Sequence, residues 1–438
     1  ANRLGGGRLR PSPVDDHERV EGLVGMTGAA SSRGHAEATE KPGRRRDLDL
    51  MRTLVVVGLV FFHSARVFDS GDFYVKNEPR SELVDAVVAF ASLWGMPLLF
   101  VISGMGIWYS LRRRTTASFA LERVRRLLVP VIFGVVVIVP PQVWTRLRGR
   151  PAYDESYWDF LSRFFDVQLT LGHFPFVVVG SPGNDLFEPA HLWFLVLLFS
   201  FTLLLVPVIW ALRRPPGLGL IRGVARSSRH LWVLAAAAIP LVVIEGLWGS
   251  ERGLAGWNRY SYLVFILYGY VLATDRRFGR ALQRHRRPAL IGAVITFAAV
   301  GAFLTGSERD VGALLVATDG PSIGFRALKA LSGWLWVVAI LGYAARSQRP
   351  GGTQADARKS PSGRRWNGVV RYASEAVLPV YVLHQTVIVL LAFYIVDWQV
   401  NALAKYLALS GLSLGVIFVL YDVVVRRTTV TRFLFGMK

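Results

Sequence analysis

Residues 52–63 read RTLVVVGLVFFH: an arginine, ten apolar or small residues, and a histidine. At 1.5 Å per residue, an α-helix through this stretch would carry His63 about 16 Å beyond Arg52. A guanidinium or an imidazole inside hydrocarbon is costly, so a residue of this kind within an apolar helix usually has a function. The stretch therefore predicts a membrane-spanning helix with a candidate site inside it.

The composition of the whole chain places this helix in a membrane protein. Hydrophobic residues make up 52% of the 438 residues, and charged residues make up only 18%. Soluble domains carry about 25% charged residues, and several apolar runs here reach the ~20 residues that a membrane-crossing helix needs. We therefore expect an all-α polytopic membrane protein.

Charge and cysteine content exclude several classes of function. The net charge of +21 does not indicate a nucleic-acid partner, because the arginines cluster in short loops between apolar runs. The chain has no cysteine, which excludes disulfides, thiol catalysis and iron–sulfur ligation but leaves the compartment open. We expect no metal site.

Ten apolar segments are predicted to span the membrane. They cover residues 51–69, 84–109, 127–145, 190–212, 230–248, 258–274, 288–305, 323–345, 375–396 and 402–425. Arginine-rich segments alternate with loops of little positive excess, and such basic segments stay in the cytoplasm. The alternation predicts a multi-pass protein of the plasma membrane with both termini cytoplasmic.

The parts outside the spans differ in character. Residues 1–46 are rich in Gly, Ser and Arg and predict a disordered basic cytoplasmic tail, in which the native status of residues 1–25 is left open. Residues 47–427 form the transmembrane domain, and residues 428–438 form a short cytoplasmic tail. The longest outer loop, about 146–189, contains the amphipathic segment YWDFLSRFF, which suits the membrane interface.

A second basic motif precedes the third apolar segment. Arg123 and Arg126 are three residues apart and are expected to share a helical face, where two guanidiniums can grip the phosphates of one ligand. On the second segment, the small residues Ser103 and Gly104 permit either close helix approach or passage of an extended ligand arm. For most arginines of the chain, the alternative is a role in topology alone.

Two residues of the first segment carry the functional hypothesis. His63 is either a proton-transfer group or an interhelical hydrogen-bonding residue. Arg52 is either a phosphate ligand, oriented by Asp49 three residues away, or an anchor at the membrane interface.

Three further residues are secondary candidates. His384, in the middle of the ninth segment, is either a second proton-handling residue or a packed core histidine. Glu188 and His191, at the outer end of the fourth segment, either bind a sugar or belong to the loop and the aromatic belt at the interface.

Taken together, five segments resemble the membrane acyltransferase type-3 family. They are RRRDLDLMRTLVVVGLVFFH, PLLFVISGMG, FALERVRRLLVP, HLWFLVLLF and LPVYVLHQTV, in the order and spacing of that family, from about residue 44 to residue 427. The specific element is the arginine and histidine separated by ten residues, reinforced by Arg-x-x-Arg at 123 and 126. PPQVW and HLWFL are most similar to the subgroup that includes glucan biosynthesis protein C.

The resemblance implies an integral membrane O-acyltransferase. It would move an acyl group, acetyl- or succinyl-like, from cytoplasmic acyl-CoA, chiefly acetyl-CoA, to a hydroxyl of an extracytoplasmic polysaccharide or glycoconjugate of the cell envelope. Carried over by position, His63 matches the essential histidine, Arg52 its partner, and Arg123 and Arg126 the basic motif. Ser103 and Gly104 would lie beside the donor, which is the only cofactor-like group implied.

A transporter or flippase for a polar or lipid-linked substrate is the alternative. Glu245, Arg326 and Lys329 would then form an ion or substrate path, although no inverted repeat or pair of broken helices is recognisable. The sequence leaves open whether His63 acts as a base or accepts the acyl group itself. It also leaves open the acyl group, the acceptor and the oligomeric state, with a homo-oligomer among the alternatives.

Overall fold

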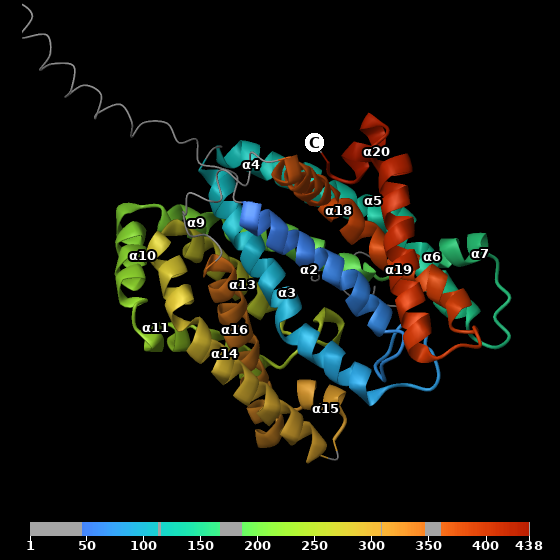
Figure 1. Ribbon diagram of the computed structural model, residues 1–438, viewed down its shortest axis with the longest axis horizontal. Coiled ribbons are helices and arrows are strands. Elements are labelled where there is room, and N and C mark those ends of the chain that lie inside the picture. The colour runs from blue at the N-terminus through green and yellow to red at the C-terminus, as the bar shows by residue number, and fades with distance from the viewer. Residues whose placement is uncertain (1–45, 113–114, 167–185, 308, 347–360, 438) are drawn as a thin grey trace, which may run out of the picture. The chain divides into compact units, whose positions relative to one another are not determined.

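The computed structural model describes residues 46–112, 115–166, 186–307, 309–346 and 361–437, and every regular element in these ranges is helical (Figure 1). The all-α prediction is thus confirmed for the described part of the chain. The predicted disordered tail lies almost wholly outside the described residues. Residues 167–185 of the long predicted outer loop also lie outside them.

All ten predicted apolar segments are helical. The helices are α2 (Arg46–Ala65), α3 (Glu82–Leu111), α4 (Thr116–Arg123), η1 (Val124–Leu128), α5 (Val129–Phe133), η2 (Gly134–Ile138), α6 (Val139–Arg148), α7 (Tyr157–Phe164), η4 (Ala190–Leu192), α8 (Trp193–Leu204), α9 (Val206–Leu212), α10 (Pro215–Ser227), α11 (Leu231–Ala236), α12 (Ile239–Trp248), η5 (Arg252–Leu254), α13 (Arg259–Thr274), α14 (Arg276–Thr305), α15 (Val311–Val316), α16 (Gly320–Arg346), α18 (Pro361–Ile395), α19 (Ala402–Leu420), η6 (Tyr421–Val425) and α20 (Thr429–Leu434). The amphipathic segment of the outer loop forms the separate helix α7.

Eight helices or continuous helical runs in the described part are long and apolar enough to cross a membrane. The segments 190–204 and 206–212 would add a ninth as one span bent by 48°. The remaining predicted segment, the sixth, forms α13, which has 16 residues, fewer than the ~20 that a span perpendicular to the bilayer needs. The chain is therefore a polytopic membrane protein, and the count of ten spans stays a prediction.

Two boundaries differ from the predicted ones in a way that matters for the site. α2 was expected over 51–69 but ends at Ala65, so His63 lies in its last turn. The third segment was expected over 127–145 but runs from 116 to 148 through α4, η1, α5, η2 and α6. Its two π-helical turns immediately precede α5 and α6, which carry Pro130 and Pro140 in their first turns. A proline lacks the N–H that an α-helix interior requires, and a wider turn accommodates that loss.

Helix packing brings α3 into direct backbone contact with α13. A Cβ at Gly104 would lie 2.0 Å from the carbonyl oxygen of Ile266, and one at Gly269 would lie 1.9 Å from that of Val101. Only glycine fits at these two positions, so the two backbones approach as closely as helices can. Of the two roles expected for Gly104, the close helix approach is the one observed.

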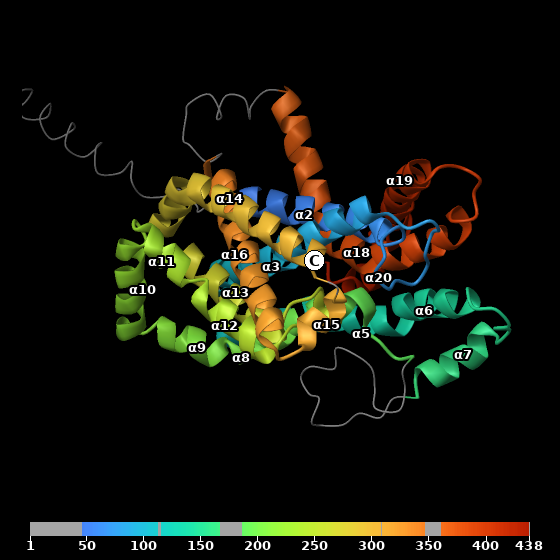
Figure 2. The same cartoon turned by 90° about the horizontal axis from the view of Figure 1, so that it is seen from below.

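Two further arrangements position the features described below. α2 lies between α3 and α18, and α14 and α16 form a long antiparallel pair beside α3 (Figure 1). α10 packs against α9 and α14 at the edge of this group (Figure 2).

Candidate active site

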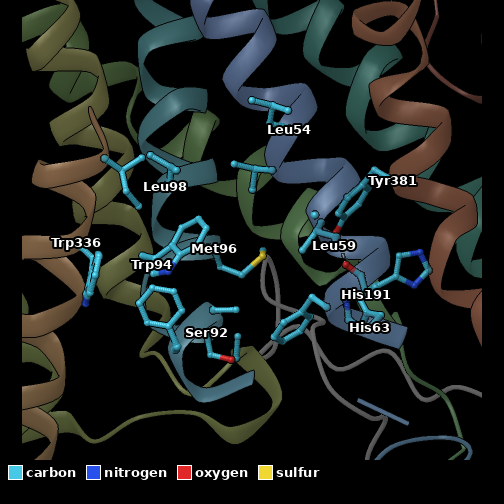
Figure 3. Close-up of a pocket in the computed structure, with 18 of the residues that line it drawn as sticks. Leu54, Leu59, His63, Ser92, Trp94, Met96, Leu98, His191, Trp336 and Tyr381 are labelled. Atoms are coloured by element: carbon cyan, nitrogen blue, oxygen red, sulfur yellow. Dashed lines mark hydrogen bonds between the residues drawn. The ribbon is translucent and has the colours of Figure 1, made fainter. Parts of the chain in front are cut away.

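His63 lies where two cavities meet. One, called the apolar cavity, has a volume of about 470 Å³, and the other, called the polar cavity, has a volume of about 870 Å³. His63 and His191 line both of them. In Figure 3, His63, His191 and Tyr381 lie together at one end of the apolar cavity, with Trp336 at the other.

The apolar cavity runs along one face of α2. Its α2 lining begins at Met51, the neighbour of Arg52, and continues at helical spacing to His63, over about 18 Å. The α2 residues that line it are Met51, Leu54, Val55, Gly58, Leu59, Phe62 and His63. α3 and α16 supply the opposite wall, which includes the indole rings of Trp94 and Trp336. Both indole nitrogens are buried without a hydrogen-bond partner among the described residues.

Two glycines keep this cavity open. Gly58 of α2 and Gly95 of α3 both line it, and a Cβ at either position would meet nothing within 4 Å. The space in front of them is therefore unfilled, so the cavity accommodates an extended apolar ligand.

The polar cavity extends from the end of α2 and the loop after it, past α3, to α14, α15, α16 and the loop before α13. The Tyr74 hydroxyl donates a hydrogen bond to the Glu188 carboxylate, and a guanidinium nitrogen of Arg146 lies 3.9 Å from the same carboxylate. Burial, followed by the charge of Glu188, raises the pKa of Tyr74 well above its ordinary value, so this hydroxyl remains a donor. Gln385 of α18 is buried and lines the same cavity.

Three histidines from three different elements form a buried cluster at the junction. The ring centroids of His63 and His384 are 5.0 Å apart, and those of His191 and His384 are 4.9 Å apart. His384 is 0% exposed and His191 is 5% exposed. No group of three or more His, Cys, Asp or Glu in the described ranges is arranged to hold a metal ion.

Backbone carbonyls fix two of these imidazoles. His384 Nδ1 lies 2.6 Å from the carbonyl oxygen of Tyr381, and His191 Nε2 lies 2.9 Å from that of Val382. Since a carbonyl only accepts, each of these nitrogens carries a proton when the ring is neutral. The Tyr381 hydroxyl donates to the His191 carbonyl, which ties η4 to α18.

Three other ring nitrogens of the cluster are left without a hydrogen bond. His63 Nδ1, His191 Nδ1 and His384 Nε2 are buried and have no hydrogen-bond partner in the described part of the structure. An unpaired buried polar atom costs stability. Three of them in one cluster, at the end of a cavity, leave hydrogen-bonding capacity that a bound ligand could use.

The three arginines that were predicted to hold the donor differ in their contacts. Arg52 and Arg126 lie close enough for their charges to interact, with Asp49 in the same neighbourhood. Arg126 Nε also donates to the Gly436 carbonyl at 3.2 Å. The Arg123 guanidinium instead lies 4.7 Å from the centre of the Phe119 ring.

The common face for Arg123 and Arg126 stays a prediction. η1 begins directly after Arg123, and its wider turn rotates Arg126 away from the position that an α-helix would give it. Ser103, half-buried on α3, lines neither of the two cavities at His63. Arg52 and Arg126 are close enough for their charges to interact at this end of α2.

His191 lines the polar cavity together with Glu188, the other residue expected at the outer end of the fourth segment. Its ring also contacts that of His384. Sequence reasoning did not single out Tyr74, Arg146 or Gln385, and no local pattern marks them, because they become neighbours only when loops and helices distant in sequence come together.

The residues behind the transporter alternative form a hydrogen-bonded network, which reaches the polar cavity at Lys329. Glu245 is 0% exposed and accepts hydrogen bonds from the Ser250 and Ser261 hydroxyls at 2.5 and 2.6 Å, from the Asn258 backbone N–H at 2.7 Å and from Lys329 at 3.1 Å. Arg326 is 1% exposed and donates to four backbone carbonyls at 2.6–2.9 Å. These buried charges are matched by fixed protein groups, so they are explained without a transported ion.

The fold and this junction define a polytopic helical membrane protein with a half-buried histidine between two cavities. The sequence matches the family model described as an acyltransferase domain over residues 45–422. The chain therefore belongs to the acyltransferase-3 family, and it is a membrane acyltransferase. No curated protein and no solved structure matches it significantly.

Proposed function

We propose that the protein is an O-acyltransferase that carries an acyl group from cytoplasmic acyl-CoA to a hydroxyl of an extracytoplasmic carbohydrate or glycoconjugate. The observation that carries this proposal is the position of His63 at the junction of the apolar and polar cavities. The glucan biosynthesis protein C-like subgroup remains a proposal based on PPQVW and HLWFL, and acetyl-CoA remains the preferred donor.

The donor would enter from the end of α2 that the charge pattern assigns to the cytoplasm. Arg52 and Arg126 would hold the CoA phosphates, because fixed guanidiniums match phosphate geometry. Eleven residues of α2 separate Arg52 from His63, about 16 Å along the helix. Eleven steps of 100° end only about 20° from the starting direction, so both residues lie on nearly the same side of α2. The thioester arm would follow the apolar cavity along that side.

The acceptor would occupy the polar cavity. Tyr74, Arg146 and Glu188 supply donors and acceptors for sugar hydroxyls, and Gln385 supplies an amide beside His384. An acceptor hydroxyl placed there would lie against His63 from the side opposite to the thioester.

The reaction then balances without a further reactant. The acceptor hydroxyl oxygen attacks the thioester carbonyl carbon while His63 takes the hydroxyl proton, the C–S bond breaks, and the proton passes to the departing thiolate to give free CoA. In the alternative route the His63 imidazole attacks first and forms an acyl-enzyme, which the acceptor hydroxyl then resolves. His384 and His191 would hold the His63 ring and its proton in place.

The test uses the purified full chain in detergent with radiolabelled acetyl-CoA and an oligosaccharide acceptor mixture. We expect free CoA release that depends on acceptor, with the label recovered on the carbohydrate by mass spectrometry. CoA release with no acylated carbohydrate would overturn the acceptor class, and no release with any acyl-CoA would overturn the donor.

A further inference from the structure

A third cavity, of about 480 Å³, lies away from His63, between α10 and α14. The described residues that line it are Ala225, Arg226, Ser228, Arg229, Arg277, Arg280, Ala281 and Arg284. Five of these eight are arginines, and none of them is acidic. None of the eight lines either cavity at His63, so this feature is independent of the proposed acyl transfer.

The arginines converge because of helical spacing. Arg277, Arg280 and Arg284 are three and four residues apart, which places them on one face of α14. Arg226 and Arg229, at the end of α10, approach the same cavity from the other side. Within the described ranges, none of the five guanidiniums forms an ion pair. The one nearby carboxylate interaction is that of Asp275, which accepts from the Arg277 backbone N–H at 2.8 Å and caps α14.

Membrane topology alone does not require these five arginines to meet around one cavity. The positive-inside rule depends on the number of basic residues in a loop and not on their meeting at one point. Like charges on one helical face repel one another, so a fold that gathers five of them leaves a strong site for an anion.

The surroundings of the cavity favour a lipid as the source of that anion. Leu220 and Val224 of α10 are 63% and 39% exposed, so α10 presents apolar side chains beside the arginines. Trp210 and Trp232, on either side of α10, are 60% and 65% exposed, as expected of tryptophans at a membrane interface. The charge pattern predicts that this interface is the cytoplasmic one, where anionic lipids and basic pockets between helices meet.

We propose that the cavity between α10 and α14 binds a phosphate-bearing anion, and that the phosphate belongs to the headgroup of an anionic phospholipid. Its acyl chains would lie along Leu220 and Val224. Guanidinium groups bind phosphate through paired N–H donors, and several of them around one cavity hold a phosphodiester more tightly than a single surface charge does.

The test measures binding of fluorescent phosphatidylglycerol to the full chain in a nonionic detergent, with phosphatidylcholine as the neutral reference and inorganic pyrophosphate as a soluble competitor. The cavity variant is Arg280→Gln with Arg284→Gln. The matched control is Arg276→Gln with Arg287→Gln, which removes the same charge from α14 at positions that are exposed like Arg280 and Arg284 but lie outside the cavity. Arg280→Lys with Arg284→Lys keeps the charge but loses the paired donors, and it serves if the Gln variant does not fold.

We expect the Kd for phosphatidylglycerol to rise at least about tenfold in the cavity variant, the loss expected when one hydrogen bond to a charged group is removed, and to change little in the control. Pyrophosphate that binds with the same dependence on Arg280 and Arg284, while the lipid binds equally to all variants, would support the phosphate site and assign it to a soluble anion. Equal loss in both variants, or no loss in either, would overturn the proposal.

Discussion

The membrane-embedded part of the chain holds two groups of buried polar side chains that differ in how completely they are paired. Around Glu245 and Arg326, every charged group contacts several fixed partners at 2.5–3.1 Å. Around His63, three imidazoles each keep a buried nitrogen without a partner. The first group stabilises the packing of α12, α15 and α16, and the second retains unused hydrogen-bonding capacity at the end of two cavities.

This difference distinguishes buried polar groups that stabilise the fold from buried polar groups that are available for binding or chemistry. A buried charge is tolerated when its partners are complete, and removing one partner then costs stability. A buried polar group that lacks hydrogen-bond partners lowers the stability of the folded protein, so its presence favours a role in binding or chemistry. The two groups should therefore respond to substitution in opposite ways.

The largest effect is expected from His63→Ala, which should lower acyl transfer per folded molecule by about 10²–10⁴-fold, because that is the usual contribution of a general base. The acyl-CoA affinity should change little, since His63 lies about 16 Å from Arg52 along α2. His63→Gln is the control, because an amide forms hydrogen bonds but cannot serve as a base near neutral pH. Near-normal turnover in the Gln variant would remove His63 from the mechanism.

Arg326→Met should lower the free energy of unfolding by about 3–5 kcal/mol, the cost of breaking a buried charged network. Four carbonyls would lose their donor, and Glu245 would lose a neighbouring positive charge. Thermal unfolding in detergent measures the loss, and turnover per folded molecule should stay near normal. A stable but inactive variant would contradict the contrast drawn between the two groups.

Arg126→Ala should weaken acyl-CoA binding by about 1.5–3 kcal/mol, the range for hydrogen bonds to charged groups. Arg52→Ala should act similarly, because the two charges interact at the same end of α2. Arg125→Ala is the matched control: the neighbouring side chain is exposed and carries the same charge. Binding measured by calorimetry that falls equally in the Arg125 and Arg126 variants would reassign Arg126 to topology.

The smallest effect is expected from Gly58→Leu, which places a side chain in the apolar cavity between Arg52 and His63. We expect acyl transfer to fall about fivefold, equivalent to the lower range of overpacking costs. Gly106→Leu is the control, since Gly106 is exposed, lies in a helix and lines neither cavity. Unchanged transfer in the Gly58 variant would mean that the donor does not follow this cavity.

The chain's class and the existence of its helices could be predicted from sequence because both depend on local properties. Runs of apolar residues long enough for a bilayer identify helices wherever they occur, and all ten predicted segments are helical. The high cost of a polar residue in such a run also singled out Arg52 and His63 before any neighbour was known. The family match over residues 45–422 agrees with that reading at the level of an acyltransferase.

The composition of the candidate site was decided only by tertiary structure, because it depends on contacts between residues far apart in the chain. Packing of η4 and α18 set His191 and His384 beside His63, and no local pattern in the sequence joins these three histidines. A π-helical turn, which no residue pattern revealed, lies between Arg123 and Arg126, and packing places Arg126 near Arg52. The cavities themselves are spaces between helices, so they exist only once the helices have packed and cannot be read from any single segment.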